Sequence, residues 1–116
     1  MLHHVSLEVD PEQAESCAVC WELLGFTRLP GTSSNFTWLE REGTQIHLIH
    51  TEAATVPVLG HPAVVVADFE ATFDALEQAG HAPERHREVW DEARGFVTTP
   101  GGHRVEFMAS PPEPMV

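Results

Sequence analysis

The chain repeats one pattern of secondary-structure signals, and this repeat constrains its fold more than any other feature. Each half begins with a strand-like segment, continues with apolar residues at helical spacing up to a glycine, and returns to strand-like segments. Equivalent positions are offset by nearly constant numbers of residues: His4 and His61 by 57, Gly25 and Gly80 by 55, His47 and Glu106 by 59. Such offsets over matching elements predict two copies of one βαβββ unit.

The first half predicts one strand, one helix and then three strands. Residues 3–9 alternate polar and apolar side chains, as half-buried strands do. Asp10 and Pro11 suit the N-cap and the first position of a helix, and Gly25 suits its C-terminal end. Further strands are expected at residues 26–29, 35–40 and 44–50.

The second half predicts the same order of elements with one gap. A strand is expected at residues 61–67, followed by a helix that Asp68 caps and Gly80 ends. An irregular stretch then precedes strands at residues 95–99 and 103–108.

These elements predict a single α+β domain over residues 1–110. It consists of repeats over about 1–52 and 58–110, and a loose, proline-rich tail follows at 111–116. We expect the two tandem βαβββ modules to form a curved mixed sheet, a cup, with the helices packed outside. A length of 116 residues leaves little room for a second domain.

The charge of the chain excludes several kinds of partner. Acidic residues number 18 and basic residues 6, all of them arginine, which gives a net charge of −12. Such a surface repels phosphate backbones and anionic lipid, so neither nucleic acid nor a membrane is expected as a partner. No N-terminal signal and no apolar run of about 18 residues is visible, so the expected location is cytoplasmic.

The two cysteines, Cys17 and Cys20, lie within the first predicted helix. A redox-active pair of this spacing would stand at the start of a helix that follows a strand. The mid-helix position instead favours two small, buried thiols.

Strand alternation places four metal-capable side chains on equivalent faces. His4 lies on the strand face opposite to the apolar residues that should pack on a helix. His47 and Glu106 likewise alternate with apolar neighbours, and His61 takes the position of His4 in the second repeat. When the sheet curls into a cup, these four side chains converge inside it.

This set of three imidazoles and one carboxylate suits one divalent metal ion, namely Zn²⁺, Ni²⁺, Fe²⁺, Mn²⁺ or Co²⁺. The chain has eight histidines, and a single histidine at a strand end is more often a hydrogen-bonded polar residue than a ligand. The matched placement of all four residues carries the prediction. The other histidines lack it and are interpreted as surface or structural: His3, His50, His81, His86 and His103.

Four stretches of the sequence resemble the metal-bearing strands of the vicinal oxygen chelate superfamily, which includes glyoxalase I, extradiol dioxygenases and bleomycin-resistance proteins. They are LHHVSLEV, TQIHLIH, LGHPAVVV and GGHRVEF. The helix end LLGF and the turn PGG are also similar to that family, and the resemblance covers nearly the whole chain. It implies that His4, His47, His61 and Glu106 occupy the ligand positions and that the protein is a homodimer.

The sequence departs from particular members of that superfamily. Glyoxalase I usually has glutamate or glutamine at the second ligand position, where this chain has His47, so Glu106 is the only ligand carboxylate that could also act as a base. The chain has no tyrosine, whereas extradiol dioxygenases and fosfomycin-resistance proteins use one near the metal. Bleomycin-resistance proteins share the fold but lack the metal set.

The resemblance implies a metal-dependent enzyme of isomerase, lyase or dioxygenase type that acts on a small organic substrate through a metal-bound oxygen. The cation would act as a Lewis acid, and Glu106 is the expected catalytic base. The alternative is a non-catalytic protein of the same fold that binds a small molecule or confers resistance. A third possibility is a regulatory or structural domain whose histidines bind metal only incidentally.

Three further residues could contact the substrate. Arg104 shares a strand face with Glu106, and could bind a substrate carboxylate through two hydrogen bonds or neutralise an acidic neighbour. Glu8 shares a face with His4 and is a second candidate base, although a solvated carboxylate is its commoner role. Trp38 could line an apolar pocket. Other aromatic residues could do the same, although such residues more often belong to the core: Phe36, Trp90 and Phe96.

Overall fold

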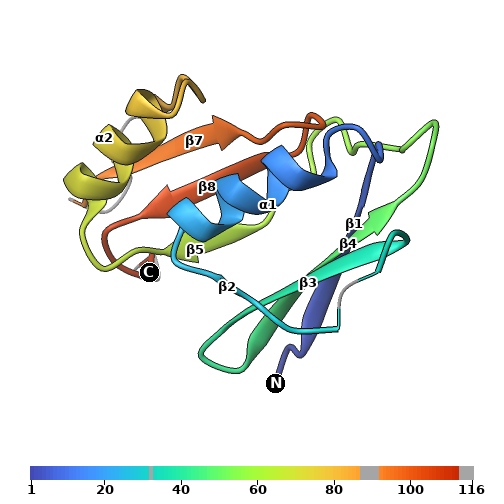
Figure 1. The fold of residues 1–116 in the computed structure, drawn as a ribbon. Coiled ribbons are helices and arrows are strands. Elements are labelled where there is room, and N and C mark those ends of the chain that lie inside the picture. The colour runs from blue at the N-terminus through green and yellow to red at the C-terminus, as the bar shows by residue number, and fades with distance from the viewer. Residues whose placement is uncertain (32, 87–91, 113–116) are drawn as a thin grey trace.

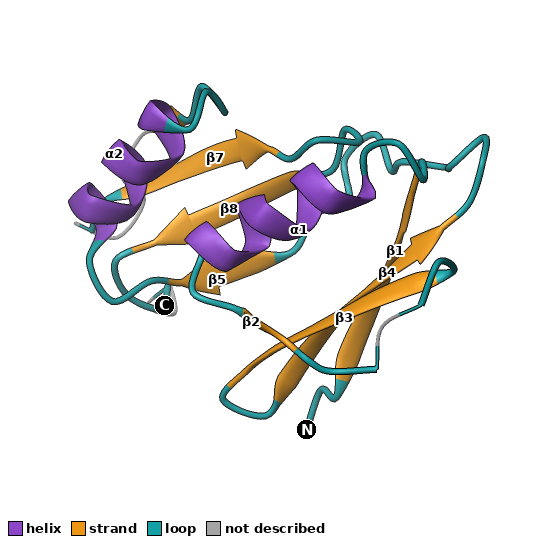
Figure 2. Cartoon of the chain, viewed as in Figure 1, coloured by secondary structure: helices purple, strands orange, loops and turns teal. Residues whose placement is uncertain are grey.

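The computed structural model describes residues 1–31, 33–86 and 92–112, so part of the predicted tail lies outside the described residues. Figures 1 and 2 show the arrangement of the helices and strands. In chain order they are β1 (His4–Val9), α1 (Ala14–Leu23), β2 (Thr27–Arg28), β3 (Phe36–Arg41), β4 (Thr44–His50), β5 (Ala63–Val65), α2 (Phe69–Gln78), β6 (Glu84–His86), β7 (Arg94–Thr98) and β8 (Arg104–Met108). Neither helix is long and apolar enough to cross a membrane.

Each repeat forms its own four-stranded mixed sheet. The strand order is β1-β4-β3-β2 in the first sheet and β5-β8-β7-β6 in the second. The first and last strands of each repeat are parallel neighbours, and the other neighbours are antiparallel. The predicted pair of βαβββ modules is therefore confirmed. Within one chain the two modules carry two separate sheets.

Alternation along the strands gives each sheet a buried apolar face and an open polar face. Leu7, Leu48 and Phe107 are buried in one core cluster together with residues of both helices. His47 and Glu106 each stand one position away from a core residue and therefore project from the opposite face. The helices thus cover the sheet faces that do not carry the candidate ligands, as predicted.

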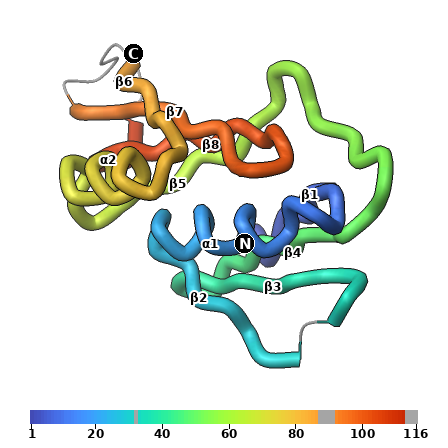
Figure 3. Tube along the Cα trace, turned by 45° about the horizontal axis from the view of Figure 1, so that its top comes forward, coloured from blue at the N-terminus to red at the C-terminus, as the bar shows by residue number. Residues whose placement is uncertain are grey.

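Helix α1 lies between the strands of the two modules, as Figures 1 and 3 both show. Four of its residues are fully buried: Cys17, Ala18, Cys20 and Trp21. Burial raises the pKa of Cys17 to about 11 and that of Cys20 to about 12, so both thiols stay protonated at neutral pH. Both cysteines are free and buried, which confirms their expected role as core residues.

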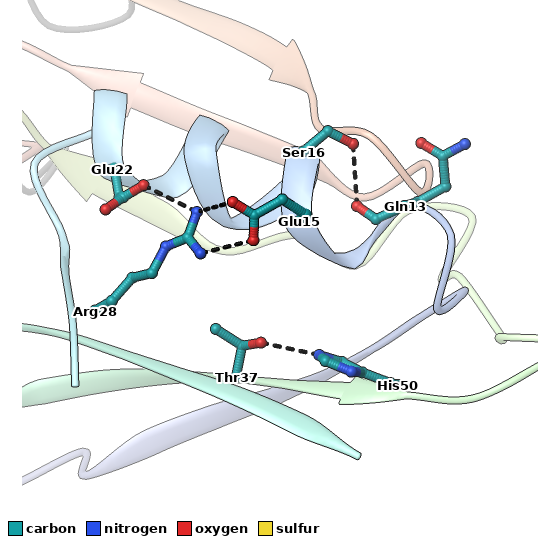
Figure 4. Close-up of polar contacts among 7 residues, drawn as sticks. All are labelled: Gln13, Glu15, Ser16, Glu22, Arg28, Thr37 and His50. Atoms are coloured by element: carbon teal, nitrogen blue, oxygen red, sulfur yellow. Dashed lines mark hydrogen bonds and ion pairs between the residues drawn. The ribbon is translucent and has the colours of Figure 1, made fainter. Parts of the chain in front are cut away.

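Side-chain hydrogen bonds tie the first helix to its sheet and the sheet strands to one another (Figure 4). Arg28 of β2 donates to Glu15 at 2.7 and 2.9 Å and to Glu22 at 3.1 Å, both of them on α1. Thr37 of β3 and His50 at the end of β4 form a hydrogen bond of 2.9 Å. His50 is therefore a structural residue, as the sequence indicates.

The two predicted helix caps have different outcomes. Asp68 caps α2 as expected, because its carboxylate accepts a hydrogen bond from the Ala71 amide at 3.0 Å. The predicted cap at Asp10 is wrong. Its carboxylate and carbonyl accept hydrogen bonds within a turn at residues 11–13, and α1 begins only at Ala14.

Strand β6 is absent from the sequence prediction, which expects an irregular stretch there. Its three residues, Glu-Arg-His, show no apolar alternation, and the strand exists because it pairs with β7 at the edge of the sheet. Gly95 permits this pairing, since a Cβ atom at that position would lie 2.7 Å from the Glu84 carbonyl oxygen. Pairing with β7 therefore makes these residues a strand, although their local sequence does not favour one.

The core assignment predicts a strong effect at Phe107, whose ring stacks on Phe69 of α2 with centroids 5.1 Å apart. Phe107→Ala should lower the free energy of unfolding by about 3–5 kcal/mol, because it leaves a cavity between β8 and α2. Urea denaturation followed by circular dichroism measures this change. The control Val19→Ala, at a position 40% exposed on α1, should change it by less than about 0.5 kcal/mol. Similar effects of the two substitutions would contradict the assigned core.

Candidate metal centre

The first sheet brings two of the predicted ligands, His4 and His47, into contact on its open face. Their strands β1 and β4 are parallel neighbours, and the two imidazole rings stack with centroids 4.0 Å apart and planes 12° apart. Trp38 stacks on the other side of His47 at 4.5 Å, and Phe36 stacks on Trp38 at 5.2 Å. Four aromatic rings therefore form a continuous ladder across β3, β4 and β1.

Hydrogen bonds orient both imidazoles of this first pair. His4 Nδ1 bonds to His3 Nδ1 at 2.9 Å, and His47 Nε2 bonds to Gln45 Oε1 at 2.7 Å. Burial lowers the pKa of His47 below its ordinary value, and the neighbouring His4 and His3 lower it further. This lowered pKa favours the neutral imidazole, which is the form of histidine that binds metals.

The second sheet brings together the other two predicted ligands, His61 and Glu106. His61 precedes β5, the parallel neighbour of β8, and its Nε2 lies 3.3 Å from Glu106 Oε1. His61 Nδ1 contacts the Leu59 carbonyl at 2.9 Å, and because a carbonyl only accepts, Nδ1 carries the proton. In the neutral ring, Nε2 therefore carries no proton, and its lone pair faces a carboxylate oxygen.

Two hydrogen-bond acceptors that converge in this way repel each other unless a proton or a cation lies between them. A second proton on His61 would satisfy them, and so would a cation bound by both atoms. Metal–ligand distances of about 2.0–2.2 Å place adjacent ligand atoms roughly 3 Å apart, which is close to the spacing of these two atoms. The donor atoms of His61 and Glu106 thus fit one divalent metal ion.

Arg94 is a site residue that the sequence prediction misses. Its Nη1 atom donates to Glu106 Oε2 at 2.8 Å, and the side chains are only 17% and 13% exposed. Oε2 is thus occupied, and Oε1 is left to face His61. A strand beginning at Arg94 instead of Gly95 would have revealed this contact, because Arg94 alternates with Phe96 onto the same face.

Phe96 lies at the centre of the open face of the second sheet. Its ring contacts His61 edge-on at 5.0 Å, and His86 of β6 lies 4.5 Å away. The guanidinium carbon of Arg104 stands 4.1 Å from the ring centroid. An aromatic ring surrounded by imidazoles and arginines is therefore packed directly beside the His61–Glu106 pair.

The remaining predicted site residues have varied surroundings. Glu8 Oε1 accepts a hydrogen bond from the Thr55 amide at 3.3 Å, so its carboxylate contacts the segment that connects the two modules. His103 is buried, and its Nε2 donates to the Glu8 carbonyl at 2.6 Å, which makes it a structural residue. Trp38 belongs to the aromatic ladder. Trp90 lies outside the described residues.

The four predicted ligands thus form two pairs, one on each sheet. Within the described part of the chain, no three His, Cys, Asp or Glu residues lie close enough together to hold a metal ion. Figure 1 marks the N-terminus, where the strand of His4 begins, at the opposite end of the view from β7 and β8. Within one chain, the predicted ligand set is therefore divided into two half-sets, His4 with His47 and His61 with Glu106.

Comparison with known proteins identifies the family. A sequence model of the glyoxalase/bleomycin resistance protein/dioxygenase superfamily matches residues 2–107. The chain belongs to this superfamily. The match confirms the resemblance of its strand sequences, and no protein of curated function matches the sequence significantly.

Solved structures of the glyoxalase superfamily share the fold of the chain. A putative glyoxalase family protein from Bacillus anthracis has a TM-score of 0.79 at 22% identity, with 93% of both chains covered. The oxidase ChaP-H2 has a TM-score of 0.76 at 19% identity, covering 96% of this chain and 94% of its own. Lactoylglutathione lyase from Agrobacterium tumefaciens has a TM-score of 0.70 at 13% identity, with 93% and 92% covered. These neighbours are named as a glyoxalase family protein, an oxidase and a lyase, so the likeness concerns the fold.

The Arg94–Glu106 contact predicts a measurable coupling at the centre of this glyoxalase-like site. In a double-mutant cycle of Arg94→Met and Glu106→Gln, the pair should contribute about 1–3 kcal/mol to the free energy of unfolding, because both side chains are largely removed from water. The matched control is the exposed pair Arg85–Glu70, which should couple less strongly. Denaturation of the four proteins in each cycle measures both values. A coupling at Arg94–Glu106 no larger than the control would contradict the positioning role.

Proposed function

We propose that the protein is a metal-dependent enzyme in which His4 and His47 of one chain bind a divalent cation together with His61 and Glu106 of a second copy. The observation that carries this proposal is the division of the four ligands into two pairs, each oriented by hydrogen bonds and each too small to hold a cation firmly by itself. Three imidazole nitrogens and one carboxylate oxygen complete a ligand set of the kind that borderline divalent metals prefer.

Exposed apolar side chains support the assembly of two copies over the open faces. Trp38 and Ile49 on the face of His47 are 38% and 42% exposed. Val58 and Leu59, three and two residues before His61 in the chain, are 89% and 81% exposed. Large apolar groups gathered beside both half-sets favour a partner surface that covers them, and a second copy supplies the missing ligands at the same time.

The residues of the site suit chemistry on a small organic substrate of isomerase, lyase or dioxygenase type. A bound divalent cation supplies Lewis-acid polarisation of a substrate oxygen. Glu106 is the proposed base, because Arg94 holds its Oε2 atom and leaves Oε1 on the open face. The aromatic ladder of Phe36, Trp38 and His47 offers a flat apolar surface on which a substrate can lie.

Mixing two variants tests whether the site is shared between chains. One variant carries His4→Ala and His47→Ala, and the other carries His61→Ala and Glu106→Gln. Coexpression with different tags allows isolation of the heterodimer, in which one shared site keeps all four ligands and the other keeps none. After incubation with Zn²⁺, Ni²⁺, Fe²⁺, Mn²⁺ or Co²⁺ and desalting, elemental analysis should find about half of the wild-type cation content in the heterodimer and almost none in either homodimer.

The other outcomes of this experiment are also decisive. A wild-type protein that retains cation, with a heterodimer that retains none, would show that the site is built within one chain. A wild-type protein that retains none of the five cations would overturn the metal-dependent function. Circular dichroism of each variant shows that the loss does not come from unfolding.

A protein that binds a small molecule without turnover is the second candidate, and the Arg94–Glu106 salt bridge favours it. Arg94 already neutralises the negative charge of this carboxylate, so that charge does not by itself require a cation. The variant His61→Ala separates the two candidates. If the protein is an enzyme, this change abolishes cation content and turnover in a screen of α-ketoaldehyde–thiol adducts and catechols. If it is a binding protein, ligand affinity survives the change, while the control His81→Ala leaves both properties intact in either case.

A further inference from the structure

Arg104 has an unusual environment for an arginine in an acidic protein. Its guanidinium group stacks on the Phe96 ring at 4.1 Å, on the open face of the second sheet. Among the described residues, no carboxylate lies within ion-pair distance of it, and no hydrogen bond from its side chain is present. The sequence left open whether Arg104 neutralises an acidic neighbour or binds a ligand, and no described acidic residue forms an ion pair with it.

The other described arginines are each engaged through their N–H groups. Their acceptors are as follows: Glu15 and Glu22 for Arg28, the Val65 carbonyl for Arg41, Glu70 for Arg85 and Glu106 for Arg94. Among the described arginines, Arg104 is therefore exceptional, although the chain has 18 acidic residues. A guanidinium that stacks on a ring keeps its in-plane N–H donors available, and these donors match a carboxylate in a two-point contact.

Arg104 lies on the same sheet face as the candidate metal centre. Arg104 and Glu106 are alternate residues of β8 and project from the same face, about 6–7 Å apart along the strand. Phe96 contacts both Arg104 and His61, so one ring fixes the guanidinium and borders the ligand pair. A small molecule held at His61 and Glu106 would thus reach Arg104 with its far end.

We propose that Arg104 is a specificity residue that binds a carboxylate of the substrate. The substrate would then be a small organic acid whose carboxylate lies several ångströms from the oxygen atoms that bind at His61 and Glu106. This inference rests on the proposed function, because it assumes that the other end of the substrate binds at the proposed metal ion. The net charge of −12 repels anions in general, so attraction of a carboxylate to this face requires a local donor such as Arg104.

Arg85 provides a matched control within the same module. Its guanidinium also stacks on a phenylalanine, 4.4 Å from the Phe73 ring, but its N–H groups bind Glu70. Arg85→Gln therefore removes the same charge and the same kind of ring contact without removing a free donor. Arg104→Gln removes the donor, and Arg104→Lys keeps the positive charge but loses the planar pair of donors.

The test compares two probes with the cation-loaded protein by isothermal titration calorimetry. The probe 3,4-dihydroxybenzoate has two vicinal oxygens at one end and a carboxylate at the other, and 3,4-dihydroxybenzamide replaces only that carboxylate by a neutral amide. The wild type should bind the benzoate at least about 10-fold more tightly than the benzamide. Arg104→Gln should weaken benzoate binding by about 10- to 100-fold and change benzamide binding little, because one charge-assisted contact is lost. The affinity of Arg104→Lys for the benzoate should lie between those of the wild type and Arg104→Gln. Arg85→Gln should bind both probes as the wild type does.

The opposite results would overturn the inference. A wild type that shows no preference for the benzoate, or a preference that persists in Arg104→Gln, means that Arg104 only packs on Phe96. The cation content of the same samples tests the proposed metal function separately. A carboxylate preference that Arg104→Gln abolishes supports the inference whether or not a cation is retained, and retained cation without such a preference overturns the inference alone.

Discussion

The parallel pairing of the first and last strands in each module determines where the candidate ligands lie. In the first sheet this pairing sets β1 beside β4, so the rings of His4 and His47 stack on one face. In the second sheet it sets β5 beside β8, so His61 reaches Glu106. Parallel neighbours cannot be joined by a tight turn, and each pair therefore requires a long crossover that contains a helix. The elements that bury the apolar sheet face are thus the same ones that bring two metal-capable side chains together on the other face.

Charge on the second sheet is organised around Glu106 and Phe96. Arg94 binds one oxygen of Glu106, which fixes the carboxylate and directs its other oxygen toward His61. Arg104 stacks on Phe96 and keeps its donors free. The two arginines stand on neighbouring strands of one face yet differ in what they bind, so one has a positioning role and the other is available to a ligand. Under the proposed role of Arg104, its free donors would attract a carboxylate on this face, although the net charge of −12 repels anions in general.

Periodicity and repetition in the sequence predict the two modules, the bounds of β4 and the strand faces of His4, His47 and Glu106. These features depend on alternation within single strands, which a sequence displays directly. Strand β6 and the role of Arg94 are not predicted, because both depend on pairing across β7. The cap at Asp10 is wrongly predicted, since a turn competes for the same acceptor atoms. The separation of the ligands into two pairs depends on how the modules pack around α1, and no local pattern encodes that packing.

The division of ligands between two sheets has a consequence for specificity under the proposed assembly. The aromatic ladder of Phe36 and Trp38 stands beside the first pair, and the arginine-bearing face of Phe96 stands beside the second. When two copies bring a first pair and a second pair together, a substrate lies between a flat apolar surface from one chain and a carboxylate-binding group from the other. A cation that binds only the complete set also favours the dimer over the separate chains, since any ligand stabilises the state that binds it. Metal binding, dimerisation and substrate selection then depend on the same contact between the open faces of the two sheets.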